Sequence, residues 1–123
     1  MSWLWVALGA AFGAPARYLT DRAVQRWHAS PFPFGTLTVN LVGSLVLGVL
    51  VGSADHGGAS SDLLLLAGTG FCGAFTTFST FGFETVRLLE EGSVLEAGLN
   101  ALGSLVLGVL AAAAGFALAA LLA

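Results

Sequence analysis

Charged residues are scarce in this chain. Lysine is absent, the only strongly basic residues are four arginines, and charged residues make up 9% of the 123 positions. Water-soluble domains carry about 25% charged residues, so a surface of this composition cannot face water on every side. With a net charge of −3, the chain also offers no basic surface for nucleic acid. The composition excludes a soluble domain and indicates that nucleic acid is not a partner.

Groups that perform catalysis are also missing. Cys72 is the only cysteine, which excludes an internal disulfide and any multi-cysteine metal site. No aspartate or glutamate falls within the long hydrophobic runs at residues 1–16, 29–54, 63–83 and 97–123, so these runs contain no general base and no acidic metal cluster. The same lack is unfavourable for a proton-coupled exporter, which relies on carboxylates inside the membrane. The sequence therefore predicts a protein that is not an enzyme.

Long hydrophobic runs are what the chain does contain. Hydrophobic residues make up 57% of it, and they gather in runs close to the roughly 20 residues that cross a bilayer. Uncharged runs of that length satisfy their backbone hydrogen bonds in hydrocarbon only as helices. We expect one all-α integral membrane domain, residues 1–123, with four transmembrane helices at about residues 2–19, 33–54, 62–83 and 97–122.

The first of these runs is the shortest, and a cleaved signal peptide is the alternative interpretation. A signal peptide begins with a positively charged region, whereas this chain begins Met-Ser-Trp-Leu-Trp. Trp3 and Trp5 suit the interface between membrane and water. The pattern therefore favours a true first helix.

An internal repeat links the second and fourth runs. Residues 40–50 and 100–110 are identical at nine of eleven positions. In each run, polar or small residues recur every four positions, which is typical of helices that approach closely. An amide in hydrocarbon is costly unless it is hydrogen-bonded. Asn40 is therefore expected either to join helices or to line a polar path.

The third run is the most unusual segment. Residues 67–83 contain five phenylalanines and five hydroxyl side chains. Helical spacing of Phe71, Phe75 and Phe78 is compatible with an aromatic packing face. However, hydroxyl side chains compete for backbone hydrogen bonds, and a break in the helix at residues 73–77 is the alternative. Backbone carbonyls freed at such a break are ready ligands for a cation.

The polar groups inside the predicted membrane region are uncharged hydrogen-bond donors. They are amides, hydroxyls and the edges of aromatic rings, which carry partial positive charge. Donors without a fixed cation suit a small anion that must bind and then leave. The polar inventory thus favours an anion path.

Three motifs resemble those of the Fluc/CrcB family of fluoride ion channels. They are Gly-Ala-Pro-Ala-Arg-Tyr at residues 13–18, the segment 35–44, and the segment 70–81. The resemblance extends over nearly the whole chain. It implies four-helix subunits with a broken third helix that assemble as an antiparallel dimer, with two fluoride pores at the dimer interface.

The resemblance also implies a role for individual residues. Along the fluoride pore it places Asn40, Phe78, Phe81, Thr36, Ser104 and Thr77. It places Arg17 at a vestibule, Glu84 near a pore mouth, and a structural sodium ion at the dimer axis on the backbone carbonyls of Gly73 and Thr76. In the fourth run, Asn100 and Gly108 depart from the polar residues that the resemblance would place there.

Two functions follow as hypotheses. The first is a passive channel that lets fluoride leave the cytoplasm down its electrochemical gradient and so reduces fluoride toxicity. The alternative is a small four-helix multidrug-type exporter, which would need a membrane carboxylate.

The charge distribution bears on the partner subunit. Arg22, Arg26 and Arg87 fall on the side opposite the two termini, with Arg17 close to it, and cationic residues tend to stay cytoplasmic. Most copies are therefore expected to place both termini outside. An antiparallel partner is then an inverted copy of this chain or an oppositely oriented paralogue.

Overall fold

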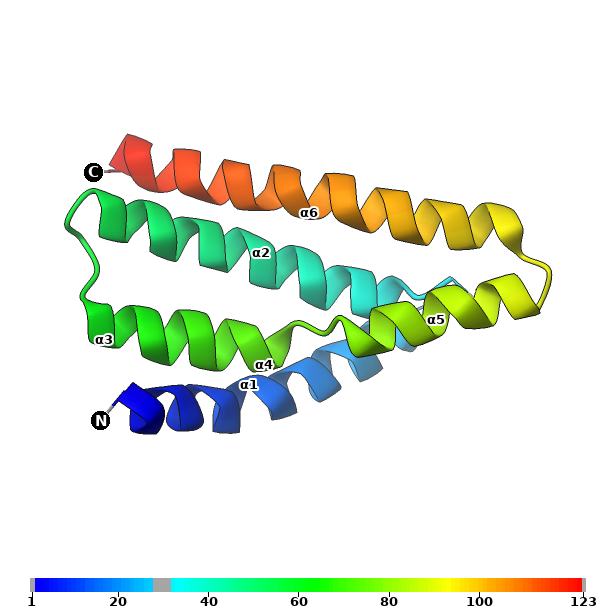
Figure 1. Ribbon diagram of the computed structural model, residues 1–123, viewed down its shortest axis with the longest axis horizontal. Coiled ribbons are helices and arrows are strands. Elements are labelled where there is room, and N and C mark those ends of the chain that lie inside the picture. Colours follow the sequence, from blue (N-terminus) through cyan, green and yellow to red (C-terminus); the bar gives the residue numbers. More distant parts are fainter. Residues whose placement is uncertain (1, 28–31, 123) are drawn as a thin grey trace.

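The computed structural model describes residues 2–27 and 32–122, and its ordered elements are all helical over that part of the chain. Four helical rods lie side by side (Figure 1). Three of the rods are single helices: α1 (Ser2–Gln25), α2 (Phe34–Asp55) and α6 (Val94–Leu122). The remaining rod is composite, with α3 (Ser61–Leu63), η1 (Leu64–Cys72, a π-helix), α4 (Gly73–Phe75) and α5 (Ser79–Glu90).

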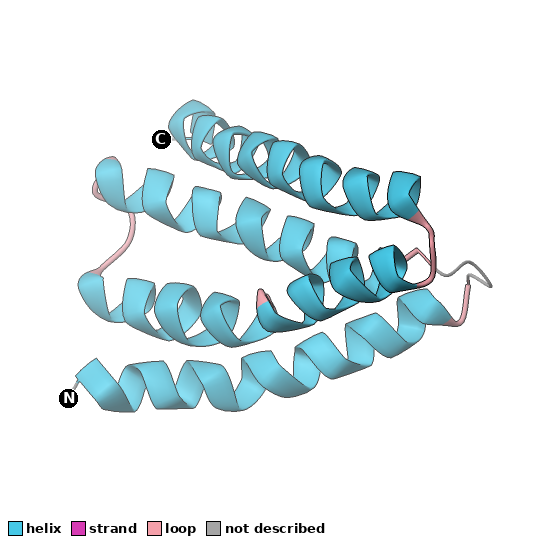
Figure 2. Cartoon of the chain, turned by 45° about the vertical axis from the view of Figure 1, so that its right-hand side comes forward, coloured by secondary structure: helices cyan, strands magenta, loops and turns pink. Residues whose placement is uncertain are grey.

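The rods alternate in direction along the chain (Figures 1 and 2). α1 and the composite rod run one way, while α2 and α6 run the other, so the two repeated segments are parallel in space. Both termini and the turn after α2 lie at one end of the bundle. The C-terminal ends of α1 and α5 lie at the other end.

Three helical segments in the described part of the chain are long and apolar enough to cross a membrane: Phe34–Asp55, Ser61–Glu90 and Val94–Leu122. This confirms the prediction of an all-α, multi-pass membrane protein. α1 has 24 residues but is not among the three. Its crossing of the membrane stays a prediction.

Two helices extend beyond their predicted ends. α1 continues to Gln25 rather than about residue 19, and α5 continues to Glu90 rather than about residue 83. The predicted boundaries were placed where charged residues begin. Arginine and glutamate are good helix formers, so the helix continues past the apolar run. α5 ends at Glu90 and is followed closely by Gly92, whose φ of 80° suits a residue without a Cβ.

Glycines set the contacts between rods. In the α2–α6 contact, a Cβ on Gly48 would meet the backbone carbonyl of Ala112, and one on Gly115 would meet that of Leu45. α1 meets η1 in the same way, because a Cβ on Gly13 would meet the carbonyl of Phe71. Small residues let helix backbones approach closely in a membrane, where the hydrophobic effect does not drive helices together.

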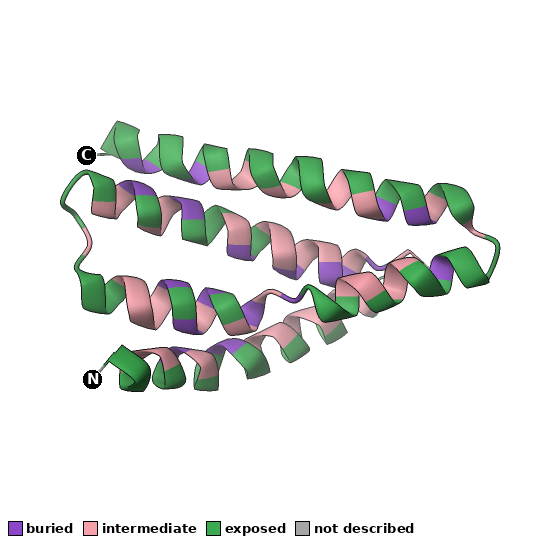
Figure 3. Ribbon diagram, in the orientation of Figure 1, coloured by how far each residue is buried: buried purple, intermediate pink, exposed green. Residues whose placement is uncertain are grey.

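Exposure is inverted relative to a soluble protein. The buried apolar residues are few, with Val39, Phe75 and Leu88 the largest, whereas leucines along α6 such as Leu102 and Leu121 are exposed (Figure 3). Large apolar side chains on the outside of a bundle are in contact with lipid tails when the helices span a bilayer.

Candidate functional site

The composite rod is not helical at residues 76–78, between α4 and α5. Thr76 has extended backbone angles, φ −81° and ψ 161°. The Thr76 hydroxyl donates to the carbonyl of Cys72 at 2.8 Å, and the Thr76 N–H donates to the same carbonyl at 3.0 Å. Two donors therefore share the last helical acceptor, and the chain leaves the helix immediately afterwards.

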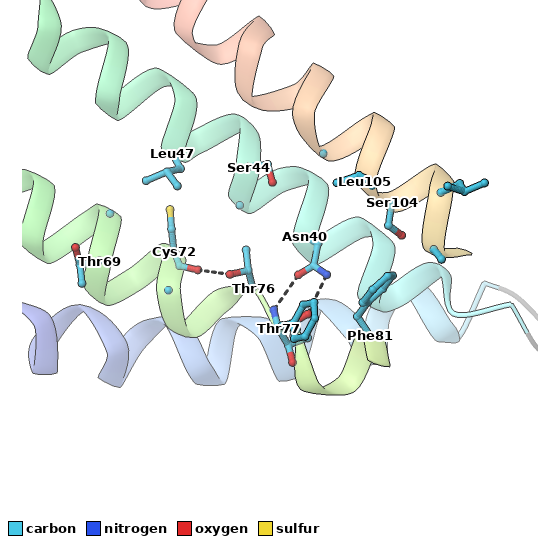
Figure 4. Close-up of a pocket in the computed structure, with 17 residues that line it drawn as sticks. Asn40, Ser44, Leu47, Thr69, Cys72, Thr76, Thr77, Phe81, Ser104 and Leu105 are labelled. Carbon is cyan, nitrogen blue, oxygen red and sulfur yellow. Dashed lines mark hydrogen bonds between the residues drawn. The ribbon is translucent and has the colours of Figure 1, made fainter. Parts of the chain in front are cut away.

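Asn40 on α2 binds the backbone at this interruption. Its Oδ1 accepts from the N–H of Thr77 at 2.8 Å, and its Nδ2 donates to the carbonyl of Thr77 at 3.0 Å (Figure 4). The side-chain amide thus pairs with both polar groups of one residue, as a neighbouring strand would. An amide nitrogen carries two hydrogens, so one N–H of Asn40 remains available to a ligand.

Thr77 in turn organises the start of α5. Its Oγ1 accepts from the N–H of Thr80 at 3.2 Å and lies 3.5 Å from the hydroxyl of Ser79. A hydroxyl that accepts from an N–H three residues on is the usual N-terminal cap. Thr77 is buried, so this capping contact lies inside the bundle.

These contacts redirect two N–H groups away from helical hydrogen bonds. In a continuous helix the N–H of Thr77 would bind the carbonyl of Gly73, and the N–H of Thr80 would bind that of Thr76. Here they bind Asn40 and Thr77 side chains instead. The carbonyls of Gly73 and Thr76 therefore lose the helical partners that they would otherwise have.

The interruption opens onto a groove of about 830 Å³ between α2, the composite rod and α6. It brings together seven of the ten residues that were predicted for the pore and the cation site: Asn40, Gly73, Thr76, Thr77, Phe78, Phe81 and Ser104. The groove is lined mostly by apolar atoms, with these polar groups placed among them.

Two aromatic rings lie in this groove. Phe78 is 84% exposed. Its ring centroid lies 6.0 Å from that of Phe81, and the ring planes are tilted by 41°. This tilted arrangement is a favoured geometry for aromatic pairs.

Three of the predicted residues lie outside the groove. Thr36 is 3% exposed at the start of α2, and its side chain is hydrogen-bonded to Glu84 of α5. Glu84 also feels the charges of Asp21 and Arg87. Arg17 is half-buried on α1. Thr36 and Glu84 are thus joined to each other at one end of the bundle, while Arg17 lies apart from the groove residues.

Asn100 has a different role from Asn40, although both begin the repeated segment. Asn100 is 1% exposed; its Nδ2 donates to the hydroxyl of Thr85 at 2.8 Å, and its Oδ1 accepts from Ser104 at 3.5 Å. Thr85 donates to the carbonyl of Phe81 at 2.8 Å. Asn100 therefore links α6 to the helix that carries Phe81 rather than lining the groove.

Sequence reasoning missed some of the lining. Ser44, Thr69 and Cys72 also face the groove. Ser44 lies four residues after Asn40, so the polar stripe on α2 was a signal for it. Gly108, which departs from the pattern in the fourth run, also lines the groove.

Comparison with known proteins identifies relatives over nearly the full length. A family described as "CrcB-like protein, Camphor Resistance (CrcB)" matches residues 4–116. A "Fluoride-specific ion channel FluC 1" of Streptomyces avermitilis is 54% identical over 115 residues, which cover 94% of this chain and 93% of the relative. A protein of the same name in Frankia casuarinae is 52% identical over 124 residues, 97% of this chain and 96% of the relative.

Less similar relatives also cover most of the chain. A "Fluoride-specific ion channel FluC" of Aliivibrio salmonicida is 45% identical over 115 residues, 93% of this chain and 91% of the relative. The family match, the full-length identity and the helical membrane fold agree, and the chain belongs to the CrcB family.

Proposed function

We propose that the protein is a fluoride-specific ion channel that lets fluoride leave the cytoplasm down its electrochemical gradient. The observation that carries the proposal is the hydrogen bonding of the Asn40 side chain. Its amide is held by two hydrogen bonds to Thr77 and keeps one N–H for a ligand in the groove. Relatives named as fluoride-specific ion channels, at about half identity over nearly the full length, support the choice of ion.

The two hydrogen bonds to Thr77 determine which atoms of the Asn40 amide can bind an ion. A free asparagine presents either its carbonyl or its N–H₂ group to a ligand. The Oδ1 of Asn40 is bound to the N–H of Thr77, so rotation of the amide would break both hydrogen bonds. Asn40 is thereby fixed as a donor, and a donor is what an anion needs.

Phe78, Phe81 and Ser104 supply the other donors in this proposal. Ring edges and a hydroxyl bind an anion weakly, and several of them together replace water of hydration. Conduction requires binding that is favourable enough for entry and weak enough for exit. We place Thr77 in the pore as well, through its contact with Asn40.

Thr36, Arg17 and Glu84 belong to the ends of the path in this proposal. Thr36 lies in the first turn of α2 and its side chain is hydrogen-bonded to Glu84 in the middle of α5, and we assign this pair to a pore mouth. The guanidinium of Arg17 would attract anions to a vestibule.

A second subunit in antiparallel orientation would close the open side of the groove. Its polar residues would otherwise face lipid tails, where unpaired polar groups are costly. In this assembly the interruption at residues 76–78 is the break of the third membrane helix. α1 is the fourth membrane span, and 24 residues at about 1.5 Å each are long enough to cross the hydrocarbon layer.

The carbonyls of Gly73 and Thr76 would hold a structural sodium ion between the two subunits. The fit rests on the lost helical partners of these carbonyls, and neutral oxygen ligands without thiolate or imidazole suit a hard cation. Replacing sodium by a large organic cation is then expected to lower the thermal stability of the dimer. Unchanged stability would argue against the site.

The exporter alternative has no support. The relatives are named as ion channels, and the groove is lined by neutral side chains. The family is one of channels, so the protein is not an enzyme.

Flux measurements in proteoliposomes test the function. We expect fluoride efflux, followed with a fluoride electrode, that greatly exceeds chloride efflux under the same voltage. Collapsing the proton gradient at a fixed voltage should leave the fluoride flux unchanged, because passive conduction needs no coupling ion. Flux that stops with the proton gradient would instead indicate a coupled transporter.

A further inference from the structure

A second cavity, of about 300 Å³, lies on the outer side of α1. It is lined by residues of two successive helical turns: Tyr18, Leu19, Arg22, Ala23 and Arg26. Residues four apart share one helix face, so the two guanidinium groups and the phenol stand in one row. Leu19 and Ala23 form the adjoining row. The proposed pore uses none of these residues.

The two arginines are free to bind an anion. The Nη1 of Arg22 donates to the Tyr18 hydroxyl at 3.1 Å, and its guanidinium carbon lies 5.7 Å from the centre of the Tyr18 ring. Among the described residues, no carboxylate pairs with Arg22 or Arg26. Asp21 is adjacent in sequence, but its carboxylate packs against Gly35 on α2.

The remaining side chains indicate the depth of this cavity in the membrane. Tyr18 is 59% exposed, and Trp27, just beyond Arg26, is 84% exposed. Exposed tyrosine and tryptophan are enriched where the bilayer meets water. Leu19 is 66% exposed and lies toward the middle of the bundle. The cavity therefore has a row of apolar side chains, Leu19 and Ala23, beside the row that carries two positive charges.

We propose that this cavity binds an anionic phospholipid, with the headgroup phosphate on Arg22 and Arg26 and an acyl chain along Leu19 and Ala23. Guanidinium groups bind phosphate oxygens through paired N–H donors. Tyr18 holds one of the two guanidinium groups in place before the lipid arrives. The single cavity thus presents the charge and the apolar surface that one lipid molecule combines.

Tryptophan fluorescence provides the test, independently of ion flux. Trp27 follows the C-terminal end of α1, whereas Trp3 and Trp5 lie at its N-terminal end, so Trp3→Phe with Trp5→Phe leaves a single reporter. Quenching by brominated phosphatidylglycerol is compared with quenching by brominated phosphatidylcholine. A cation at the membrane surface contributes about a fivefold preference for anionic lipid. Arg22→Gln and Arg26→Gln should each reduce the preference by about that factor.

Arg87→Gln is the matched control, because it removes one charge from α5 at the same end of the bundle. It should keep the preference for phosphatidylglycerol. Equal losses in all three variants would overturn the proposal in favour of a general surface-charge effect, and so would equal quenching by both lipids in the parent protein. Loss of the preference when excess inorganic phosphate is added would also overturn it, because the site would then hold free phosphate rather than lipid.

Discussion

At the scale of single residues, Asn40 joins structure to proposed function. Its amide completes the hydrogen bonding of Thr77 across 37 positions of sequence. A buried backbone group left without a partner costs about 1–3 kcal/mol. By binding both backbone groups of Thr77, Asn40 therefore stabilises the non-helical segment that lies beside the groove. The same two hydrogen bonds fix which of its atoms an ion can meet.

Asn40→Asp is expected to abolish fluoride flux. A carboxylate cannot donate to the carbonyl of Thr77, and its charge repels an anion. At about 4 Å and an effective dielectric constant of about 20, that repulsion amounts to about 4 kcal/mol, which predicts a loss of at least about a hundredfold. Fluoride efflux from proteoliposomes measures it, and gel filtration verifies that the variant assembles. Normal flux in an assembled variant would remove Asn40 from the pore.

Phe78→Ile and Phe81→Ile are expected to reduce flux while the protein still assembles. Isoleucine approximates the bulk of the side chain but lacks the positively polarised ring edge. Phe83→Ile is the matched control, because Phe83 is on the same helix, is 67% exposed and does not line the groove. The prediction fails if all three variants conduct equally.

At the scale of the elements, helix contacts depend on individual glycines. Glycines at the same position of the two repeated segments have different roles in these contacts. Gly48 and Gly108 occupy the same position in the two copies of the repeat. A Cβ on Gly48 would meet the backbone of Ala112, whereas one on Gly108 would come no closer than 3.8 Å, to the hydroxyl of Ser44. Gly48 brings α2 and α6 together, and Gly108 faces the groove.

Gly48→Ala is expected to destabilise the protein by about 1–3 kcal/mol, because the clash is with backbone and no side chain can move aside. Gly103→Ala is the control, since a Cβ there meets nothing within 4 Å. It should be neutral or stabilising by up to about 1 kcal/mol through helix propensity. Thermal denaturation in detergent compares the two, and equal effects would contradict the assignment of Gly48 to the α2–α6 contact.

At the scale of the whole molecule, charge is unevenly distributed between the two ends. Arg17 and Arg22 lie in the second half of α1, Arg26 follows directly after its last residue, and Arg87 lies near the end of α5. These two helix ends are at the same end of the bundle, away from the termini (Figure 1). Because cationic residues favour the cytoplasmic side, this end is expected inside the cell.

A pair of C-terminal reporters tests this orientation, one active only in the cytoplasm and one only outside. We expect activity mainly from the outside reporter, so that an antiparallel dimer requires an inverted minority of copies or an oppositely oriented paralogue. Equal activity from both reporters would show dual insertion and a self-sufficient homodimer.

Helix number, direction and membrane character follow from sequence alone. In hydrocarbon, long uncharged runs satisfy their backbone hydrogen bonds only as helices. Because these hydrogen bonds form within each run, the sequence of the run is enough to predict its helix. The ends of the helices were harder to predict from sequence, because a charged residue marks the end of the apolar run but does not end the helix. The candidate groove residues came from resemblance to a family; seven of the ten line one groove, while Thr36, Glu84 and Arg17 do not.

Only the tertiary structure decided how the two nearly identical repeated segments come to make different contacts. Asn40 and Asn100 have nearly the same neighbours in sequence, yet Asn40 binds the backbone of Thr77 and Asn100 binds the hydroxyl of Thr85. The partner depends on which part of the composite rod each helix approaches. Gly43 lets α2 come close beside Thr76, next to the N–H and carbonyl groups of Thr77 that Asn40 binds. Sequence determines the polar groups, and helix packing determines which of them meet.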